Sequence, residues 1–290
     1  MNVLVLGATG MLGSAAFRVL AKSAGVQVFG AVRRADAKRL FAPELASRLV
    51  VVDDVEDHQQ LERLFETVRP QVVINCTAVR KPVPPDPMKS ISIFSLLPHR
   101  LERLCRLRGA RLIQISSDGV FSGSRGAYTE DDLPDANDLY GVAKLLGEVS
   151  EPHAVTLRTS IIGHELQTKA GLIEWFLSQD EQCRCYTRAI FSGFPTVVLA
   201  RVIRDVIIPR PALHGVFHVA TQPISKYDLL RLVAEVYGKK IEIIADDSVV
   251  IDRSLNSGRF ASATGYVAPG WPELIGIMRA DRDEGTNDAA

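Results

Sequence analysis

Hydrophobic residues in the first 160 positions occur as short apolar runs that alternate with longer amphipathic stretches. The apolar runs predict strands at residues 2–7, 26–32, 48–54, 71–78, 110–117 and 154–163. Stretches with helical periodicity lie between them, at 11–23, 60–68, 98–109 and from 139 onward. Alternating strands and helices predict a parallel sheet, and strands rich in Val, Ile and Leu indicate that helices cover both of its faces. The predicted fold class is therefore α/β, with a doubly wound parallel sheet.

The pattern becomes less regular after Gly163, where a second part of the chain begins. Helices are predicted at 171–179 and 225–238, and a strand at 241–246. The apolar helix at 196–208 is expected to pack back on the first part. We expect a first domain of residues 1–163 with 196–220 packed against it, a smaller C-terminal lobe from 164–195 and 221–280, and a flexible polar tail at 281–290. At this length one large domain is the alternative.

The first strand runs into a glycine-rich turn, GATGMLG, at the start of the following helix. Glycine permits a tight strand-to-helix turn and lets the backbone approach a pyrophosphate. The helix N-terminus adds unpaired N–H groups that bind phosphate. This context predicts a Rossmann dinucleotide-binding domain, although a glycine turn without a ligand remains the alternative. The residues expected to contact the cofactor phosphates are Gly7, Thr9, Gly10, Met11, Leu12 and Gly13.

The end of the second strand indicates which dinucleotide binds. NAD sites usually place an acidic residue there for the ribose 2′-hydroxyl, but this strand ends in Arg33 and Arg34. A guanidinium suits the 2′-phosphate of NADP through charge-assisted hydrogen bonds. We therefore predict NADP(H), and with it reduction rather than oxidation. Two surface arginines without a ligand remain the alternative.

Residues after the third and fourth strands complete the predicted cofactor site. Asp54 and Val55 are expected to contact the adenine, with Asp53 and Asp57 as alternative acids. After the fourth strand come small residues that allow close approach to the phosphates and ribose, namely Cys76, Thr77 and Ala78. Cys76 and Ala78 can equally belong to the core.

A serine, a tyrosine and a lysine are expected to meet at the carboxyl end of the fifth strand. Ser116 and Ser117 end that strand, and Tyr140 and Lys144 share one face of the next helix at i,i+4 spacing. Reduction of a ketone needs hydride at carbon and a proton at oxygen, which a tyrosine with a lowered pKa supplies. A lysine ammonium is expected to lower the pKa of Tyr140, and a serine hydroxyl to stabilise the developing alkoxide. Alone the Tyr-Lys pair is common in helices; beside the glycine turn it favours catalysis.

Three motifs, GATGMLG, SSDGVFSG and YGVAK, resemble those of the extended short-chain dehydrogenase/reductase family. The stretch ISSDGVFSGSRGAYTEDDLPDANDLYGVAKLLGE is similar to the dTDP-4-dehydrorhamnose reductase-like sugar-nucleotide reductases, and the likeness weakens after residue 160. The resemblance implies a homodimer, and a catalytic set of Ser117, Tyr140 and Lys144. It also implies that Thr159 and Ser160 lie near the nicotinamide. Substrate contacts are expected from Ser117, Asp118, Gly119 and Val120.

The chain departs from this family's pattern at several positions. Gly119 stands where rhamnose-type reductases commonly carry a large residue, which implies extra space beside the substrate. Asp118 is not followed by glutamate, whereas sugar-nucleotide dehydratases typically carry an Asp-Glu pair, so a 4,6-dehydratase is disfavoured. Phe94 stands where asparagine is common, and the proline-rich KPVPPDP occupies residues 81–87. Neither feature has a functional explanation from the sequence.

Two arginines of the second lobe are candidates for binding a substrate diphosphate. Arg188 lies in YTRAIFSGFPT, which is expected to be a loop facing the crevice. By the resemblance, Arg253 lies near the substrate's nucleotide. Surface ion pairs are the alternative for both side chains. The histidines at 164, 214 and 218 show no metal-ligand spacing, so no metal site is predicted.

Composition narrows the classes of function. Lys+Arg and Asp+Glu residues both number 34, so no net charge favours a nucleic acid or a membrane surface as a partner. The apolar runs are too short for a membrane span, and the N-terminus does not resemble a signal peptide. The four cysteines fit reduced thiols, so a cytoplasmic location is expected.

These features together predict an NADPH-dependent reductase of a nucleotide-activated 4-keto-6-deoxy sugar. Hydride would go to C4 and the proton would come from Tyr140, in the synthesis of surface polysaccharide precursors. An epimerase or epimerase/reductase on the same scaffold is one alternative. A non-catalytic, NADP-binding regulatory subunit is another, because some proteins that resemble rhamnose reductases serve that way. Intact Ser117, Tyr140 and Lys144 favour an enzyme.

Overall fold

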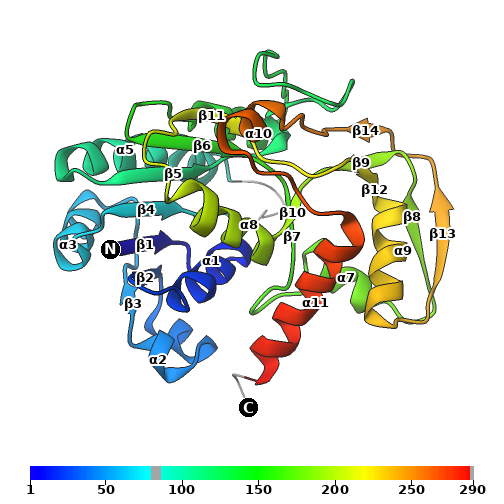
Figure 1. The fold of residues 1–290 in the computed structure, drawn as a ribbon, viewed down its shortest axis with the longest axis horizontal. Coiled ribbons are helices and arrows are strands. Elements are labelled where there is room, and N and C mark those ends of the chain that lie inside the picture. Colours follow the sequence, from blue (N-terminus) through cyan, green and yellow to red (C-terminus); the bar gives the residue numbers. More distant parts are fainter. Residues whose placement is uncertain (80–85, 288–290) are drawn as a thin grey trace.

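Seven parallel strands form the central sheet of the computed structural model, which describes residues 1–79 and 86–287 (Figure 1). Most of the proline-rich stretch 81–87 lies outside the described residues. The strand order is β11-β6-β5-β4-β1-β2-β3, as in a doubly wound Rossmann-like sheet. The strands are β1 (Asn2–Leu6), β2 (Gln27–Val32), β3 (Leu49–Val51), β4 (Val72–Asn75), β5 (Arg111–Ile115), β6 (Ala154–Arg158) and β11 (Gly215–His218). The predicted fold class is confirmed.

Alternate residues of each central strand enter two separate hydrophobic cores. In β1, Val3 and Val5 face one core, whereas Leu4 and Leu6 face the other. The first core is covered by α1 (Met11–Ala21), α8 (Thr196–Val202) and the π-helix η4 (Ile203–Ile207). The second is covered by α3 (His58–Val68), the π-helix η2 (Ile91–Leu96) and α5 (Leu97–Arg108). Burial on both faces explains the near-continuous apolar strands.

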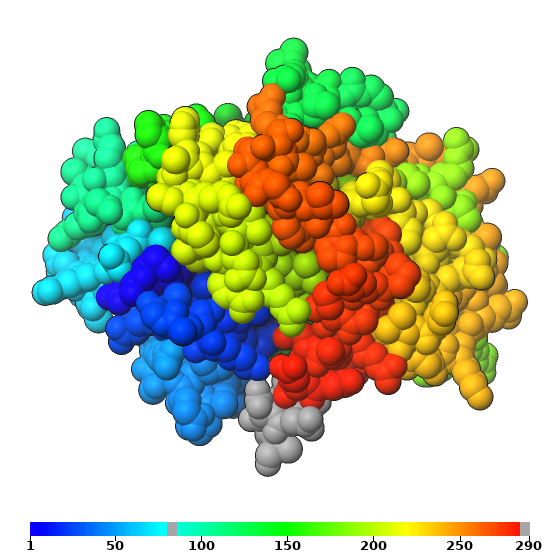
Figure 2. All heavy atoms as spheres, in the orientation of Figure 1, coloured from blue at the N-terminus to red at the C-terminus, as the bar shows by residue number. Residues whose placement is uncertain are grey.

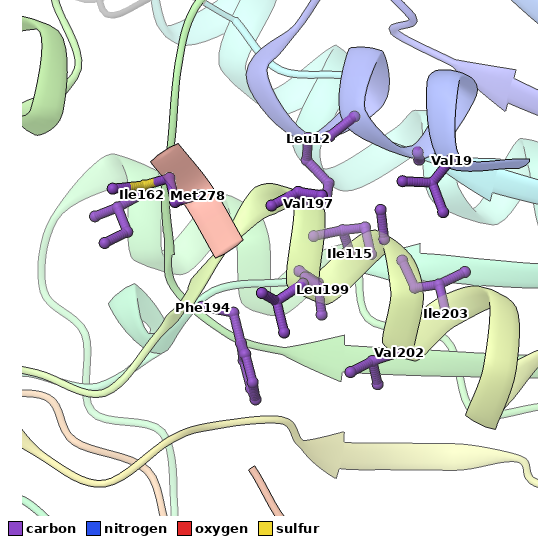
Figure 3. Packing of buried hydrophobic residues seen from close by; sticks show 14 of the residues in the cluster. Leu12, Val19, Ile115, Ile162, Phe194, Val197, Leu199, Val202, Ile203 and Met278 are labelled. Atoms are coloured by element: carbon purple, nitrogen blue, oxygen red, sulfur yellow. The ribbon is translucent and has the colours of Figure 1, made fainter. Parts of the chain in front are cut away.

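The segment from 196 to 220 returns to the central sheet. Val197 of α8 lies beside Leu12 of α1, and Ile203 lies further along the same layer (Figure 3). The chain then adds β11, which pairs in parallel with β6. The sequence pattern did not predict β11, because four residues with a central aromatic carry little periodicity.

The part of the chain at 161–195 and 221–287 consists of helices and short strands outside the central sheet. Its larger elements are α7 (Leu172–Leu177), α9 (Lys226–Tyr237), α10 (Gly258–Thr264), α11 (Trp271–Asn287), β8 (Gln182–Tyr186) and β13 (Glu242–Asp246). Its short strands are β7 (Ile161–Ile162), β9 (Ala189–Phe191), β10 (Phe194–Pro195), β12 (Ile224–Ser225) and β14 (Ile251–Asp252). The remaining helices of the chain are η1 (Ala35–Leu40), α2 (Pro43–Ala46), α4 (Pro87–Ser90), η3 (Asp118–Val120) and α6 (Leu139–Leu146).

Residues 281–287 continue α11 instead of forming the start of a flexible tail, so that expectation is wrong for this segment. Arg18 of α1 pairs with Asp281 at 2.7 Å, and Lys22 pairs with Glu284 at 3.1 Å. Figure 2 shows α11 (red) lying between α9 (yellow) and the surface formed by α1 and α8. Two acidic residues of this segment, Asp281 and Glu284, thus pair with basic residues of α1.

Candidate active site

The predicted site residues follow the carboxyl ends of neighbouring parallel strands. The order of the sheet reverses between β1 and β4, which is where ligands bind in open α/β sheets. The glycine turn follows β1, Cys76 follows β4, Ser117 follows β5 and Thr159 follows β6. Because these strands are adjacent and parallel, the structure brings the four segments to one edge of the sheet.

Tyr140 and Lys144 both lie on α6. Asp138 caps this helix by accepting a hydrogen bond from the Gly141 N–H at 2.7 Å. Gly141 is required there, because a Cβ would overlap the carbonyl oxygen of Gly119. The cap and the close approach fix where the helix begins, and therefore which turn presents the tyrosine and the lysine.

The structure brings Ser117 and Tyr140 into contact, and Lys144 lies one turn further along the same helix. The Tyr140 side chain is hydrogen-bonded to Ser117. Ser117 Oγ also accepts from the Gly119 N–H at 3.0 Å, which holds the hydroxyl in place. Lys144 is buried and donates from Nζ to the carbonyl oxygen of Ile115 at 3.0 Å.

The pKa of Tyr140 moves in the direction opposite to the prediction. Burial raises the pKa above its ordinary value, and the hydrogen bond from Ser117 offsets this only in part. The Lys144 ammonium donates to the Ile115 carbonyl oxygen, and its presence on the same helix does not prevent the rise in the Tyr140 pKa. Tyr140 therefore keeps its proton at neutral pH, which is the state a proton donor needs.

Lys144 carries a lowered pKa. Burial lowers the pKa of its ammonium from the usual 10.5 to about 8, and Cys76 and Glu148 oppose the shift. A lysine near this value can take up or release a proton around neutral pH. Lys144 is thus suited to proton exchange as well as to fixed hydrogen bonding.

Asp118 is held close to the catalytic serine. Ser117 Oγ lies 3.1 Å from Asp118 Oδ1, and Ser160 is also hydrogen-bonded to this carboxyl. Burial raises the pKa of Asp118, whereas these two hydroxyls and Arg253 act in the other direction. The carboxyl, both hydroxyls and the guanidinium therefore form one polar cluster beside Tyr140.

Two expectations about the residues after Asp118 are wrong. A Cβ at Gly119 would lie 2.9 Å from Cε1 of Tyr140, so the tyrosine ring fills the space expected for substrate. Val120 is fully buried against Phe121 and Tyr128, so its side chain is turned away from the crevice. The turn after β5 therefore offers Ser117 and Asp118, but not the side chain of Val120, to a ligand.

The second serine of the pair anchors a buried polar network. Ser116 Oγ donates to Glu148 Oε1 at 2.7 Å, which turns it away from Tyr140. Arg158 binds both oxygens of Glu148, from Nε and Nη2, at 2.8 Å each. Arg158 Nη1 lies 3.3 Å from His218 Nε2, and His218 Nδ1 lies 2.9 Å from the Tyr128 carbonyl oxygen. Nδ1 must donate to that carbonyl, so Nε2 is the acceptor and the imidazole is neutral.

We expect His218 to make stability depend on pH. Burial and then Arg158 lower the pKa of His218 from 6.5 to about 4, so the unfolded chain binds a proton that the native chain does not. Stability is therefore complete above pH 6.5 and falls as pH drops towards 4, by about 3 kcal/mol in total. Between pH 7 and pH 4.5, the free energy of unfolding in urea should fall by about 2–3 kcal/mol less in His218→Asn than in the wild-type protein. The same change at exposed His58 serves as control, and equal losses in all three proteins would contradict the assignment.

The glycine turn has the geometry of a close backbone approach. Gly7 has φ +74°, and a Cβ there would lie 2.7 Å from the carbonyl oxygen of Cys76. A Cβ at Gly13 would overlap the carbonyl oxygen of Gly7, so α1 packs against the turn only with glycine. Leu12 packs in the core beside Val197 (Figure 3), which leaves only its backbone to face a ligand.

The two arginines after β2 differ in their surroundings. Arg34 pairs with Asp36 at 3.1 Å, whereas exposed Arg33 forms no ion pair within the described residues. Of the acids after β3, Asp57 caps α3 by accepting from two backbone N–H groups. Exposed Asp54 accepts from the Glu56 N–H at 2.8 Å. Arg33 is therefore the freer guanidinium, and Asp57 is occupied by a structural role.

The remaining cofactor candidates include one thiol with a raised pKa. Burial raises the pKa of Cys76 to about 12, so it is a neutral thiol. Thr77 Oγ1 donates to Asn75 Oδ1 at 2.6 Å, while Ala78 is exposed and Val55 is half-buried. Thr159 is buried, and its hydroxyl donates to the Ser160 carbonyl oxygen at 3.2 Å.

The lobe contributes two arginines of different exposure. Arg188 follows β8 and is exposed. Arg253 follows β14; its Nη2 lies 3.7 Å from Asp138 Oδ2, and its buried Nε finds no hydrogen-bond partner among the described residues. Ser192, expected in an open loop, is buried and accepts from the Leu255 N–H at 3.0 Å.

Sequence reasoning missed Gln114, which supports the site. Asn75 Nδ2 donates to Gln114 Oε1 at 2.8 Å, and Gln114 Nε2 donates at 3.1 Å to the same Ile115 carbonyl that receives Lys144. Glu148 was missed as well, although a polar residue inside an apolar strand, such as Gln114, is a usable signal. Within the parts of the chain that are described, no acidic or thiol cluster could hold a metal, and no helix is long and apolar enough to cross a membrane.

Comparison with known proteins gives two kinds of relatives. The chain is 29% identical over 261 residues to methionine adenosyltransferase 2 subunit beta of Rattus norvegicus, covering 81% of this chain and 72% of that protein. It is 35% identical over 99 residues to dTDP-4-dehydrorhamnose reductase of Streptomyces griseus, covering 33% of this chain and 32% of that protein.

Solved structures show the same fold. The dTDP-4-dehydrorhamnose reductase of Bacillus anthracis in complex with NADP has a TM-score of 0.78 at 18% identity, covering 97% of this chain and 99% of that chain. The Bordetella bronchiseptica enzyme WbmG in complex with NAD and UDP has a TM-score of 0.77 at 20% identity, covering 99% of this chain and 97% of that chain. The family model described as the RmlD substrate binding domain matches residues 1–251. The resemblance seen in the motifs is thereby confirmed, and the chain belongs to the RmlD substrate-binding domain family.

Proposed function

We propose that this protein is an NADPH-dependent reductase of a nucleotide-activated 4-keto-6-deoxy sugar, acting in the cytoplasm on surface polysaccharide precursors. The observation that carries the proposal is the convergence of Ser117, Tyr140 and Lys144 at the carboxyl end of β5. A phenol that keeps its proton, a serine hydroxyl and a lysine with a pKa near 8 are the groups that ketone reduction needs.

The residues after β1 and β2 fit a dinucleotide with a 2′-phosphate. The turn at Gly7 and Gly13 leaves no room for a Cβ, so its backbone N–H groups can approach a pyrophosphate. Arg33, which forms no ion pair among the described residues, is proposed to supply the guanidinium, and Asp54, Val55, Cys76, Thr77 and Ala78 are proposed to line the rest of the site. When bound, the cofactor supplies hydride. The Bacillus anthracis reductase is in complex with NADP, whereas WbmG is in complex with NAD. The preference of this chain for NADP or NAD therefore depends on its own residues.

Three residues of the chain handle the substrate oxygen. Ser117 is proposed to donate its hydroxyl hydrogen to the carbonyl oxygen, which stabilises negative charge as it develops. Tyr140 is proposed to release its phenolic proton to the same oxygen. Lys144, buried and near its pKa, is proposed to stabilise the phenolate that remains.

The lobe is proposed to bind the nucleotide part of the substrate. The buried Nε of Arg253 needs an acceptor, and a phosphate oxygen meets that need through a charge-assisted bond. Exposed Arg188 is proposed to bind the second phosphate and neutralise its charge. Thr159 and Ser160 are proposed to border the nicotinamide. We propose the lobe as residues 164–195 and 221–280, and a homodimer as the assembly.

We expect Arg33→Ala to weaken NADPH binding by roughly 10–100-fold, because a hydrogen bond between charged groups contributes about 1.5–3 kcal/mol. NADH binding should stay within about twofold, since NADH lacks the 2′-phosphate. Arg34→Ala is the matched control: Arg34 is already paired with Asp36, so its effect should be smaller. Dissociation constants for both cofactors from fluorescence titration check this. Equal losses for NADPH and NADH would contradict a 2′-phosphate contact at Arg33.

A second candidate function is a non-catalytic regulatory subunit, and the relatives named as methionine adenosyltransferase 2 subunit beta favour it. Such a role requires the dinucleotide fold but no proton donor. The close association of Ser117, Tyr140 and Lys144 supports an enzyme instead. An epimerase or epimerase/reductase would use the same residues with cofactor retained through purification.

The deciding experiment follows oxidation of NADPH and NADH with a panel of dTDP- and UDP-linked 4-keto-6-deoxy sugars, N-acetylated members included. Oxidation of NADPH by one class of sugar supports the reductase and identifies the nucleotide. Binding of NADPH without turnover of any sugar contradicts it. A complex with a methionine adenosyltransferase catalytic subunit, tested by sedimentation, would then favour the regulatory role.

A further inference from the structure

Phe94 lies on the π-helix η2, between α4 and α5. Hydrogen bonds from two residues that follow Phe94, Ser95 of η2 and His99 of α5, dock this part of the chain against α6. Ser95 Oγ donates to the Ala143 carbonyl oxygen at 2.9 Å, and His99 Nε2 lies 2.7 Å from the Leu146 carbonyl oxygen. π-Helical turns occur often at functional sites.

The ring of Phe94 contacts both Tyr140 and Lys144. It meets the Tyr140 ring edge to face, with centroids 5.4 Å apart and an interplanar angle of 85°. The Lys144 ammonium lies over the face of the same ring, 4.9 Å from its centroid. The backbone at Gly119 also lies close to Cε1 and Cδ1 of Tyr140. The Tyr140 ring thus packs against both Phe94 and the backbone at Gly119.

We propose that Phe94 is a positioning residue of this site, which fixes the ring plane of Tyr140 and holds the Lys144 ammonium against an aromatic face away from water. The inference rests on the proposed function only in taking Tyr140 and Lys144 as the reacting pair. Phe94 itself is buried and reaches any substrate through these two side chains.

Two physical effects of the ring act on Lys144 in opposite directions. The aromatic face attracts the ammonium and favours its charged form. The bulk of the ring excludes water and favours the neutral form. The other groups facing Lys144 are Cys76 after β4 and Glu148 after α6. Those around Tyr140 are Asp118, Asp138 and Arg253.

The two effects can be separated by two substitutions. Phe94→Leu keeps an apolar side chain but removes the aromatic face, so the pKa of Lys144 should fall by roughly half to one pH unit. Phe94→Asn admits water and a polar group, so the pKa should rise. Leu96→Asn makes the same kind of change at an exposed position of the same π-helix and should shift nothing.

The pKa is measured from the 13Cε shift of Lys144 in lysine-labelled full-length protein, assigned with Lys144→Arg. Opposite shifts in the two Phe94 variants support the proposal. An unchanged Lys144 pKa in Phe94→Leu overturns the proposal, and so does a fall that Leu96→Asn matches. If Phe94→Asn does not fold, the result for Phe94→Leu decides alone. Since the titration needs no substrate, it stands apart from the proposed function. If the reductase assay failed but the pKa shifts were observed, the positioning role of Phe94 would still stand.

Discussion

Tyr140→Phe is expected to lower kcat for sugar reduction by roughly 10²–10⁴-fold, the usual contribution of a positioned general acid. The phenylalanine ring keeps the contacts with Phe94 and Gly119, so the change removes the hydroxyl and little else. Steady-state NADPH oxidation at saturating sugar measures the effect. The Kd for NADPH should change by less than about threefold, because the same fold still presents the glycine turn.

The matched control for this experiment is Tyr128→Phe. Tyr128 stacks on Phe121, with centroids 4.2 Å apart, and its hydroxyl accepts from the Arg125 N–H at 3.3 Å. Its removal should leave kcat nearly unchanged. If Tyr140→Phe retained more than about a tenth of wild-type activity, far above the loss expected for a general acid, Tyr140 would not be the proton donor.

Glu148→Ala is expected to destabilise the native state by about 3–5 kcal/mol. The change leaves the buried Arg158 guanidinium and the Ser116 hydroxyl without their acceptor. An unpaired buried charge costs far more than the pair itself contributes. The free energy of unfolding from urea titration at pH 7 measures the loss.

Two further variants test whether the burial of Glu148 and Arg158 causes this loss of stability. Glu284→Ala breaks the exposed pair with Lys22, whose side chains are 65% and 63% accessible, and should cost less than about 1 kcal/mol. Replacing Glu148 and Arg158 together with apolar residues should recover most of the stability, because no buried charge is left. A Glu148→Ala loss no larger than that of Glu284→Ala would show that the network is not what stabilises this region.

Much of the fold was predictable because periodicity is local. Val3 to Leu6 alternate between two cores, and that alternation follows from a sheet covered on both faces. The same local logic fails for strands of two or three residues, such as β7 and β14, which are too short to show a period. It also misjudged 281–287, which continues α11 and in which Asp281 pairs with Arg18 and Glu284 with Lys22.

The site was predicted in outline but not in its electrostatics. Adjacent serines look equivalent in sequence, yet Ser117 bonds to Tyr140 while Ser116 bonds to Glu148, 32 residues away. The direction of the pKa shift at Tyr140 depends on burial by segments far apart in the chain.

The sequence by itself determined the parallel α/β sheet, the close glycine turn after β1, and the helical face that carries Tyr140 and Lys144. These features rest on interactions within a few residues, so spacing and residue type suffice to predict them. Only the tertiary structure decided the state of Tyr140, the neutral His218, the loss of Val120 from the crevice, and the contact of Phe94 with both reacting side chains. Each of these depends on packing between distant segments, because desolvation and ring contacts arise only once the chain has folded.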